Sequence, residues 1–235
     1  MSTPPPIVKV LATSAAISQA LATEVAALSA QRIAESGRFT VAISGGSLPA
    51  ILCKDLANDS SVDWSKWIVF LADERCVPND HPDSNLALIQ KELLSKVGIT
   101  NMHSINDALL VAKDGSCGND ETAKVAADYE QQLRFVFGAN IVFDLILLGM
   151  GPDGHTASLF PGHRLLNVVH PATPIAYVVD SPKPPPARIT LTYPVLNAAK
   201  KVIFVSTGEG KAQVLYDILL KGDDYPSGIL SSHAS

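Results

Sequence analysis

The sequence predicts an α/β fold in which an open, mostly parallel sheet is covered by helices on both faces. Two observations predict it. Short apolar runs that end abruptly in glycine or in charged residues, such as FTVAISGG at 39–46 and WIVFLADER at 67–75, are typical of buried parallel strands. Segments with apolar residues at helical spacing alternate with these runs along the chain, as they do in α/β proteins.

The first helical segment lies near the N-terminus. Residues 14–37 place Ile17, Leu21 and Leu28 roughly on one face, and Gly37 is a natural helix stop. We therefore expect an amphipathic helix that packs on the sheet. The two strands named above follow it in the chain.

A second helix is predicted over 81–98. Asp83 or Ser84 is its candidate N-cap, and Gly98 stands just beyond its end. Residues 106–121 form the least patterned interior stretch, so we expect a surface loop there. Helical spacing resumes directly after this loop.

The C-terminal half continues the alternation of strands and helices. Three apolar runs predict further strands, and the last of them is followed by a segment with helical spacing. The strands are FDLILLG at 143–149, IAYVV at 175–179 and KVIFVST at 201–207, and the helix is EGKAQVLYDILLKG at 209–222.

The composition limits the classes of function. With 235 residues, of which 47% are hydrophobic and 17% charged, the chain can bury one sizeable core. We expect a single catalytic domain over 1–235 with a flexible N-terminal tail over 1–6. The formal net charge of −5 provides no basic field that would attract nucleic acid. No secretory signal and no run of about 18 apolar residues is found, so we expect neither export nor a membrane partner.

The cysteines indicate a reducing compartment. Cys53, Cys76 and Cys117 are odd in number, widely spaced and without a C-x-x-C pair. This pattern predicts neither a disulfide framework nor a zinc site. We expect a cytoplasmic protein in the cytosol, present as a monomer or a weak homo-oligomer.

Glycine-rich and charged segments follow the predicted strands directly. Open α/β sheets bind ligands at the carboxyl ends of their strands, so these segments are expected to meet. They are the turn Ser44-Gly45-Gly46-Ser47, the charged group Asp73-Glu74-Arg75, the loop MGPDGH at 150–155 and the turn TGEGKA, which contains Lys211. Two glycine-rich turns, two cations, several carboxylates and a histidine suit a small phosphorylated substrate.

The strand at 143–149 runs into a literal G-x-G-x-x-G at Gly149, Gly151 and Gly154. A dinucleotide-binding site is not expected from it, because Pro161 interrupts the crossover helix that such a site needs. The acid expected about 20 residues further on is also missing, since none occurs before Asp180. Gly151 and Gly154 are instead expected to shape a catalytic, substrate-binding loop.

Three other motifs are incomplete. GGSLP has Pro49 where G-x-S-x-G needs its second glycine, so Ser47 is not expected to act as a nucleophile. GEGKA lacks the spacing and the hydroxyl of a nucleotide-binding P-loop. His155, His163 and His170 lack the helical spacing of zinc proteases, and we expect no metal.

Several segments together resemble the 6-phosphogluconolactonase family. They are ISGGSLP, LADERCVP, DHPDSN, FDLILLGMGPDGHTASLFPGH and SPKPPPARITLTYPVLNAAKKVIFVSTGEGKA, and the resemblance covers the chain from about Val8 to Leu220. GMGPDGHTASLFP is highly specific. The resemblance implies hydrolysis of 6-phosphoglucono-δ-lactone in the pentose phosphate pathway, without a cofactor. It also implies the modified Rossmann-like, doubly wound, mostly parallel sheet that this family shares with glucosamine-6-phosphate deaminases, ribose-5-phosphate isomerases and CoA transferases.

The chemistry of lactone hydrolysis selects candidate catalytic residues. A δ-lactone is an activated ester, so it needs an aligned water, a base and donors for the tetrahedral oxyanion, without a metal or covalent nucleophile. His155 is the candidate base, since an ordinary histidine pKa lies near 6.5. Asp153 is expected to orient the imidazole or, alternatively, to cap a turn. Backbone N–H groups between Gly151 and Thr156, at the start of a short helix, are the candidate oxyanion donors.

The remaining candidates are expected to bind the phosphorylated sugar. The turn after the first strand offers consecutive N–H groups to the phosphate, and Arg75 and Lys211 add charge-assisted hydrogen bonds. Pairing with local carboxylates is the alternative for both cations, and Arg188 either contacts substrate or anchors its loop. The full set of expected binding residues is Ser44, Gly45, Gly46, Ser47, Asp73, Arg75, Gly151, Gly154, Arg188 and Lys211.

The C-terminal end departs from the family pattern. The resemblance implies another strand and a closing acidic helix, whereas the chain reads DDYPSGILSSHAS. We therefore expect an atypical or truncated tail over 222–235, with apolar sheet surface left exposed. Two other hypotheses stay open. A glucosamine-6-phosphate deaminase or isomerase would release ammonia, and a non-catalytic sugar-phosphate-binding protein would bind without turnover.

Overall fold

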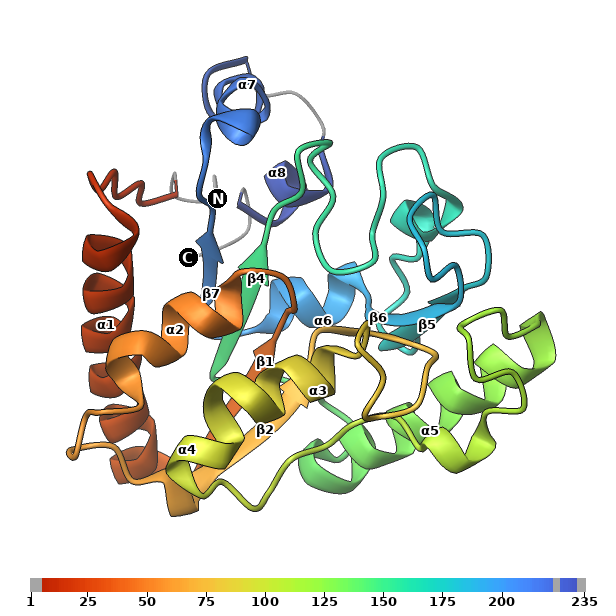
Figure 1. Ribbon diagram of the computed structural model, residues 1–235, viewed down its shortest axis with the longest axis horizontal. Coiled ribbons are helices and arrows are strands. Elements are labelled where there is room, and N and C mark those ends of the chain that lie inside the picture. Colours follow the sequence, from red (N-terminus) through yellow and green to blue (C-terminus); the bar gives the residue numbers. More distant parts are fainter. Residues whose placement is uncertain (1–5, 222–224, 232–235) are drawn as a thin grey trace.

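The structure is a computed structural model, and it describes residues 6–221 and 225–231 (Figure 1). Short 3-10 segments and two π-helical segments join or extend the regular elements. The helices are α1 (Ser14–Ser36), α2 (Leu48–Leu56), α3 (Asn85–Ile89), α4 (Ser95–Val97), α5 (Asn119–Phe137), α6 (Tyr193–Ala198), α7 (Ala212–Tyr216) and α8 (Pro226–Ser231). The strands are β1 (Phe39–Ile43), β2 (Trp67–Leu71), β3 (Asp73–Arg75), β4 (Leu145–Gly149), β5 (Ile175–Val178), β6 (Arg188–Leu191) and β7 (Val202–Val205).

The central sheet is parallel, with the strand order β2-β1-β4-β7. Every residue of β1 is buried, because this strand has a neighbour on each side and helices packed against it. A strand buried on both faces needs a continuous apolar run, and FTVAI supplies one. The predicted α/β fold with a mostly parallel sheet is therefore confirmed (Figure 1).

A second, antiparallel sheet with the order β3-β6-β5 was not predicted. The run IAYVV was expected in the open sheet, but it forms β5 and pairs with β6, a strand that was not expected from the sequence. A parallel pair needs a crossover of about a dozen residues or more, whereas residues 179–187 make a shorter return connection without a crossover helix. These nine residues therefore join the two strands as antiparallel neighbours.

Ala72 divides the predicted strand over 67–75 between the two sheets. Its N–H donates to the Ile43 carbonyl at 3.1 Å, and its carbonyl accepts from the Leu191 N–H at 2.9 Å. The residues before Ala72 therefore extend the parallel sheet, while those after it belong to the antiparallel sheet. This division carries the side chains of β3 to the place where the two sheets meet.

The predicted helix boundaries are confirmed where local capping decides them. Ser84 is the N-cap of α3 because its hydroxyl accepts from the Ala87 N–H at 3.2 Å. The helical run that starts there ends at Gly98, which has a φ of 69°. Gly37 ends α1 in the same left-handed conformation, with a φ of 74°.

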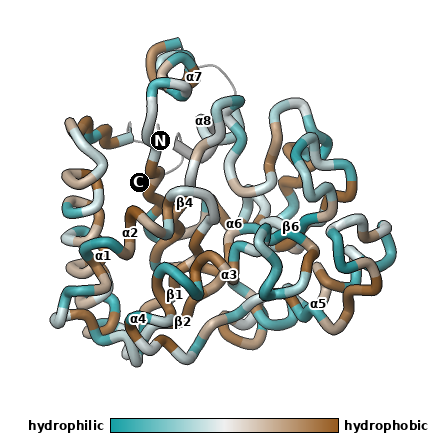
Figure 2. The backbone as a smooth tube through the Cα atoms, viewed as in Figure 1, coloured by the Kyte–Doolittle hydropathy of each residue, from teal (hydrophilic) through white to brown (hydrophobic). Residues whose placement is uncertain are grey.

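The core surrounds the central sheet, and the hydrophobic segments in Figure 2 concentrate along its strands. Tyr129 of α5 fastens this helix to the end of β2. Its hydroxyl accepts from the Leu71 N–H at 2.7 Å and donates to the Leu71 carbonyl at 2.9 Å. No helix among the described residues is long and apolar enough to cross a membrane.

The two predicted tails lie partly outside the described residues. Of the N-terminal tail over 1–6, the structure describes Pro6 alone. Of the C-terminal tail over 222–235, it describes 225–231, which contain α8. Ser227 donates to the Gly154 carbonyl through its N–H at 3.2 Å and through its hydroxyl at 3.0 Å. This part of the tail therefore contacts the loop that follows β4.

Candidate active site

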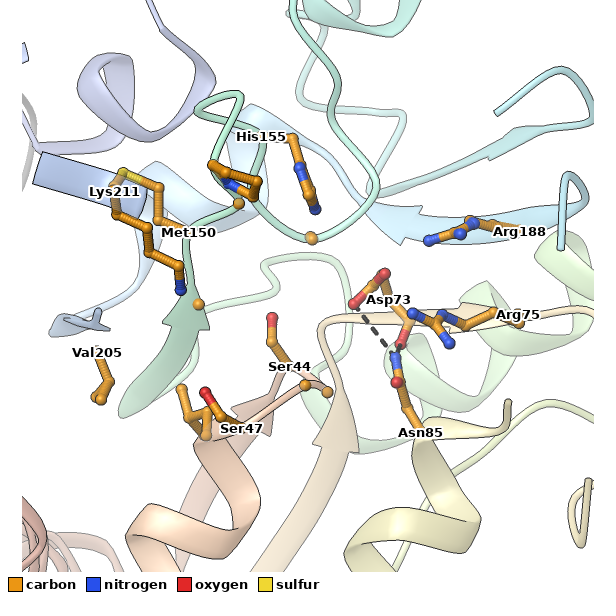
Figure 3. A pocket seen from close by; sticks show the side chains of 17 residues that line it. Ser44, Ser47, Asp73, Arg75, Asn85, Met150, His155, Arg188, Val205 and Lys211 are labelled. Carbon is orange, nitrogen blue, oxygen red and sulfur yellow. Dashed lines mark hydrogen bonds between the residues drawn. The ribbon is translucent and has the colours of Figure 1, made fainter. Parts of the chain in front are cut away.

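A cavity of about 220 Å³ lies at the carboxyl ends of β1, β4 and β7 and beside β3 and β6 (Figure 3). It is the position at which open α/β sheets bind ligands. The residues that line it are Ser44, Gly45, Gly46, Ser47, Leu48, Asp73, Arg75, Asn85, Gly149, Met150, Gly151, Pro152, His155, Ala157, Arg188, Val205 and Lys211.

The cavity brings together most of the residues selected from the sequence. Asp153 and Gly154 do not line it, although both belong to the loop after β4. Seven further residues line it that were not predicted as site residues, namely Leu48, Asn85, Gly149, Met150, Pro152, Ala157 and Val205. Met150 stood inside the quoted MGPDGH loop, and Asn85 inside DHPDSN, so motif position was the available signal for both.

The His155 imidazole contacts the Asp153 carboxylate through Nδ1. Its Nδ1 lies 2.5 Å from Oδ1 of Asp153, and its ring packs against Phe160 with the centroids 4.9 Å apart. An ionised carboxylate only accepts, so it selects the tautomer with the proton on Nδ1. The Nε2 atom is then the basic nitrogen of the ring.

Burial and neighbouring charge act in opposite directions on this histidine. Burial lowers the pKa of His155 below 6.5, and the nearby Lys183 ammonium lowers it further, while Asp153 raises it. The net shift of this pKa is downward, so the imidazole stays neutral to lower pH. For Asp153, burial raises the pKa, but hydrogen bonds from His155 and Lys183 outweigh it and hold the value at about 2.

The loop after β4 has a conformation that its glycines permit. Gly154 has a φ of 80°, and a Cβ on Gly151 would collide with the His155 ring and with Asp153. Ala157 also has a positive φ, 48°, which is unusual for a residue with a side chain. The loop therefore approaches His155 closely, which a side chain on Gly151 would prevent.

The prediction of a short helix after Gly151 is wrong. The segment forms turns, and the Gly151 N–H donates to the His155 carbonyl at 2.9 Å. The Gly154 and Thr156 N–H groups also bond within the loop, to the carbonyls of Gly151 and Leu159 at 3.0 and 3.3 Å. Three of the expected oxyanion donors are thus engaged by the loop itself, because its tight turns satisfy their own backbone groups.

The Ser44–Ser47 turn forms the opposite wall of the cavity. Gly46 has a φ of 74°, and a Cβ on Gly45 would collide with the Asn85 side chain. The Ser44 hydroxyl is buried and has no hydrogen-bond partner among the described residues. The turn leads directly into α2, so its N–H groups lie at the positive end of a helix dipole.

The two arginines of the cavity are anchored by backbone carbonyls rather than by carboxylates. Arg75 donates from Nη1 to the Asp83 carbonyl at 2.8 Å. Arg188 donates from Nε to the Pro185 carbonyl at 2.9 Å, and from Nη2 to the carbonyls of Lys183 and Pro184 at 2.9 and 3.0 Å. These hydrogen bonds of Arg188 agree with the expectation that it anchors its loop.

Burial and the neighbouring Arg75 lower the pKa of Arg188 to about 10, which leaves its guanidinium charged at neutral pH. Lys211 lies on the other side of the cavity from both arginines (Figure 3). Burial lowers its pKa, and within the described part of the chain its ammonium makes no hydrogen bond or ion pair.

The two carboxylates of β3 have different surroundings. Asp73 faces the cavity, and its Oδ2 accepts from the Ser158 hydroxyl at 2.7 Å. Glu74 is fully buried and accepts the N–H groups of Arg75, Asn85 and Leu86, each at 2.8 Å. Burial raises the pKa of Glu74 to about 7 in spite of these donors. Glu74 thus supports the start of α3, whereas Asp73 belongs to the site.

No three histidine, cysteine, aspartate or glutamate side chains of the described ranges converge in the manner of metal ligands. The cavity is instead characterised by one histidine with its carboxylate, by cations on two sides and by a glycine-rich turn. This arrangement can deprotonate a water and hold an anionic substrate.

Comparisons with known proteins agree with this chemistry. A model of the family described as glucosamine-6-phosphate isomerases/6-phosphogluconolactonase matches residues 12–235. The chain is 45% identical over 213 residues to 6-phosphogluconolactonase of Rattus norvegicus, covering 86% of this chain and 78% of that protein. It is 42% identical over 224 residues to the probable 6-phosphogluconolactonase of Schizosaccharomyces pombe, with 92% and 83% covered. The solved structure of 6-phosphogluconolactonase from Trypanosoma brucei superimposes with a TM-score of 0.85 at 26% identity, covering 100% of this chain and 94% of the other.

Proposed function

The chain belongs to the family of glucosamine-6-phosphate isomerases and 6-phosphogluconolactonases, and within this family we propose that it hydrolyses 6-phosphoglucono-1,5-lactone to 6-phosphogluconate. The observation that carries the proposal is the Asp153–His155 pair at a cavity lined by a glycine-rich turn and three cations. The relatives of 42–47% identity named as 6-phosphogluconolactonases favour this reaction over deamination and over binding without turnover. The reaction places the enzyme in the oxidative pentose phosphate pathway.

His155 acts as the general base in this proposal. Its Nε2 takes a proton from water while the water oxygen attacks C1 of the lactone. The C1 carbonyl becomes a tetrahedral oxyanion, which then re-forms the carbonyl as the bond between C1 and the ring oxygen breaks. The imidazolium returns the proton to the departing ring oxygen. Asp153 accepts from Nδ1 throughout, so it fixes the tautomer and stabilises the imidazolium.

The two ends of the substrate are assigned to different sides of the cavity. We assign the 6-phosphate to the turn over Ser44, Gly45, Gly46 and Ser47 together with Lys211. In Figure 3, Ser44 and Ser47 lie nearer to Lys211 than to the two arginines. We assign the lactone end to the side that holds Arg75 and Arg188. A single phosphate is not expected to contact both Lys211 and Arg75.

The oxyanion needs donors other than the Gly151, Gly154 and Thr156 N–H groups, because these three bond within the loop after β4. We assign this role to the guanidinium groups of Arg75 and Arg188, which line the cavity and carry a positive charge that a neutral donor lacks. Asp73 lines the same side and holds its carboxylate toward the Ser158 hydroxyl.

We also propose that the protein works in the cytosol. Its three cysteines are buried and unpaired, as expected in a reducing compartment. The substrate is a phosphorylated sugar lactone, and no cofactor enters the proposed reaction.

The experiment that tests the proposal is lactone hydrolysis by the purified chain. 6-Phosphogluconolactone would be generated in situ, and acid release would be followed above the spontaneous background, with circular dichroism on the same sample. Acceleration that disappears in His155→Ala supports the reaction and its base. A folded sample that releases ammonia from glucosamine 6-phosphate and leaves the lactone untouched would establish the deaminase alternative instead.

A further inference from the structure

Lys183 lies behind the candidate base, in the connection between β5 and β6, and does not line the cavity. Its Nζ is 3.2 Å from each carboxylate oxygen of Asp153 and 3.1 Å from Nδ1 of His155. The lysine side chain is 37% exposed and the histidine side chain 19% exposed. A cation therefore stands within contact distance of the imidazole on the side away from Nε2.

The three groups can be assigned donor and acceptor roles. A lysine ammonium and an imidazole N–H both donate, whereas an ionised carboxylate only accepts. Asp153 therefore accepts from Lys183 and from His155 Nδ1, and the approach of Nζ to Nδ1 is a contact between two donors. Such a contact is tolerated by a neutral ring and becomes repulsive when the ring is protonated.

We propose that Lys183 is a positioning residue, which orients the Asp153 carboxylate toward His155 and keeps the imidazole neutral so that its Nε2 can act as the base. This inference rests on the proposed function, because it gives His155 that role. Lys183 acts through two other side chains and does not touch the substrate.

Three charged groups bear on His155, each from a different segment. Asp153 comes from its own loop, Lys183 from the connection between β5 and β6, and Asp73 from β3. The two carboxylates raise the pKa of His155, whereas Lys183 lowers it together with burial. Lys183 is thus the one charge of these three that opposes protonation of the ring.

The backbone of Lys183 is held from both sides, so its position is defined. Its carbonyl accepts from the Arg188 guanidinium at 2.9 Å and from the Ser181 hydroxyl at 2.9 Å. Its N–H donates to the Ser181 hydroxyl at 3.2 Å. Arg188 in turn lies over the Phe160 ring, 5.7 Å from its centroid, and the His155 ring packs against the same phenyl ring. Arg188 therefore braces the loop that presents Lys183.

The test compares Lys183→Met, which removes the charge and keeps the length, with Lys183→Arg, which keeps the charge. The pH dependence of kcat/KM reports the protonation of the base in the enzyme without substrate. We expect kcat/KM of Lys183→Met to be roughly threefold below the wild type at the pH plateau and about tenfold lower still on the acid limb. The reason is that a unit charge near 3 Å shifts the pKa of the base by about one unit even in a medium like water. Lys183→Arg should keep the acid limb of the wild type.

Two controls separate this role from others. Lys91→Met removes an equal charge from a side chain that is 80% exposed, and its pH profile should match the wild type. Proton NMR titration measures the midpoint of His155 protonation directly in the wild type and in Lys183→Met, and it needs no turnover. It therefore tests the inference even if lactone hydrolysis by the wild type is not found.

An upward shift of the His155 midpoint in Lys183→Met, with Lys183→Arg close to the wild type, supports the proposal. The same midpoint in all variants would overturn it. A rise in KM with unchanged kcat and an unchanged acid limb would also overturn it, because it would make Lys183 a substrate contact.

Discussion

The two sides of the cavity differ in how their polar groups are satisfied. At the reaction side, His155 lines the cavity, and Asp153 and Lys183 behind it contact His155 and each other at distances between 2.5 and 3.2 Å. At the phosphate side, the Ser44 hydroxyl and the Lys211 ammonium have no such partner in the described part of the chain. The base is thus satisfied by partners within the protein, whereas Ser44 and Lys211 present groups that a ligand can satisfy.

The difference separates catalysis from binding. A base must have its tautomer and proton affinity set before substrate arrives, so it needs partners within the protein. A binding group that is already paired would have to exchange one hydrogen bond for another, with little net gain. Substitutions on the reaction side should therefore change kcat, and those on the phosphate side should change KM.

The largest effect is expected for His155→Ala. Loss of the base should reduce kcat by about 100-fold or more and leave KM within about threefold. In the wild type, activity should fall only as the pH drops below about 6.5, since burial lowers the pKa of His155 and the base works unprotonated. Steady-state kinetics between pH 5 and 8, with His170→Ala on an exposed loop as the control, would measure both. An unchanged kcat would remove His155 from the reaction.

A smaller effect on kcat is expected for Asp153→Asn. An amide can present either a donor or an acceptor to Nδ1, so it no longer enforces the tautomer that leaves Nε2 basic. We expect kcat to fall by roughly 30-fold with KM nearly kept. If KM rose instead while kcat held, Asp153 would belong to the binding side and the contrast between the two sides would fail.

On the phosphate side, Lys211→Met should raise KM for the phosphorylated lactone by about tenfold, because one charge-assisted hydrogen bond to phosphate is lost. The kinetics of unphosphorylated gluconolactone should not change. Steady-state assays of Lys211→Met with each of the two lactones would measure both values of KM in the same variant. An equal loss on both substrates would place Lys211 at the reacting centre.

The smallest effects are expected on the free energy of unfolding, when each of two buried serines, Ser44 and Ser158, is replaced by alanine. Ser44→Ala removes a hydroxyl that has no partner among the described residues, so the free energy of unfolding should change by less than about 0.5 kcal/mol. Ser158→Ala removes the donor to Asp73 at 2.7 Å and should cost about 1–2 kcal/mol. Urea unfolding monitored by circular dichroism would measure both values. Equal losses would mean that Ser44 is already bonded within the fold.

The sequence was sufficient where neighbouring residues decide the structure. The N-cap at Ser84 and the helix ends at Gly37 and Gly98 depend on hydrogen bonds and φ angles within a few residues. The apolar runs of the parallel sheet were recognisable for the same reason. The position of the cavity then followed from the rule that open α/β sheets bind at the carboxyl ends of their strands.

The sequence was insufficient where distant segments meet. The pairing of β5 with β6 was missed because ARITL carries no turn signal of its own and its partner strand precedes a proline-rich connection. The helix expected after Gly151 was wrong because the loop closes its own hydrogen bonds. Neither Asn85 nor Lys183 belongs to the segment that carries His155, so local pattern did not connect them to it.

By itself, the sequence determined the alternation of strands and helices, the glycine-rich turns at the strand ends and the chemical types of the site residues. These properties depend on local propensity and on the spacing of apolar residues. Only the tertiary structure decided that Lys183, 30 residues beyond Asp153, shares its carboxylate with His155. It also decided that Lys211 and Arg75 stand on opposite sides of the cavity. Long-range contacts of this kind arise when two sheets pack together, and no single segment encodes them.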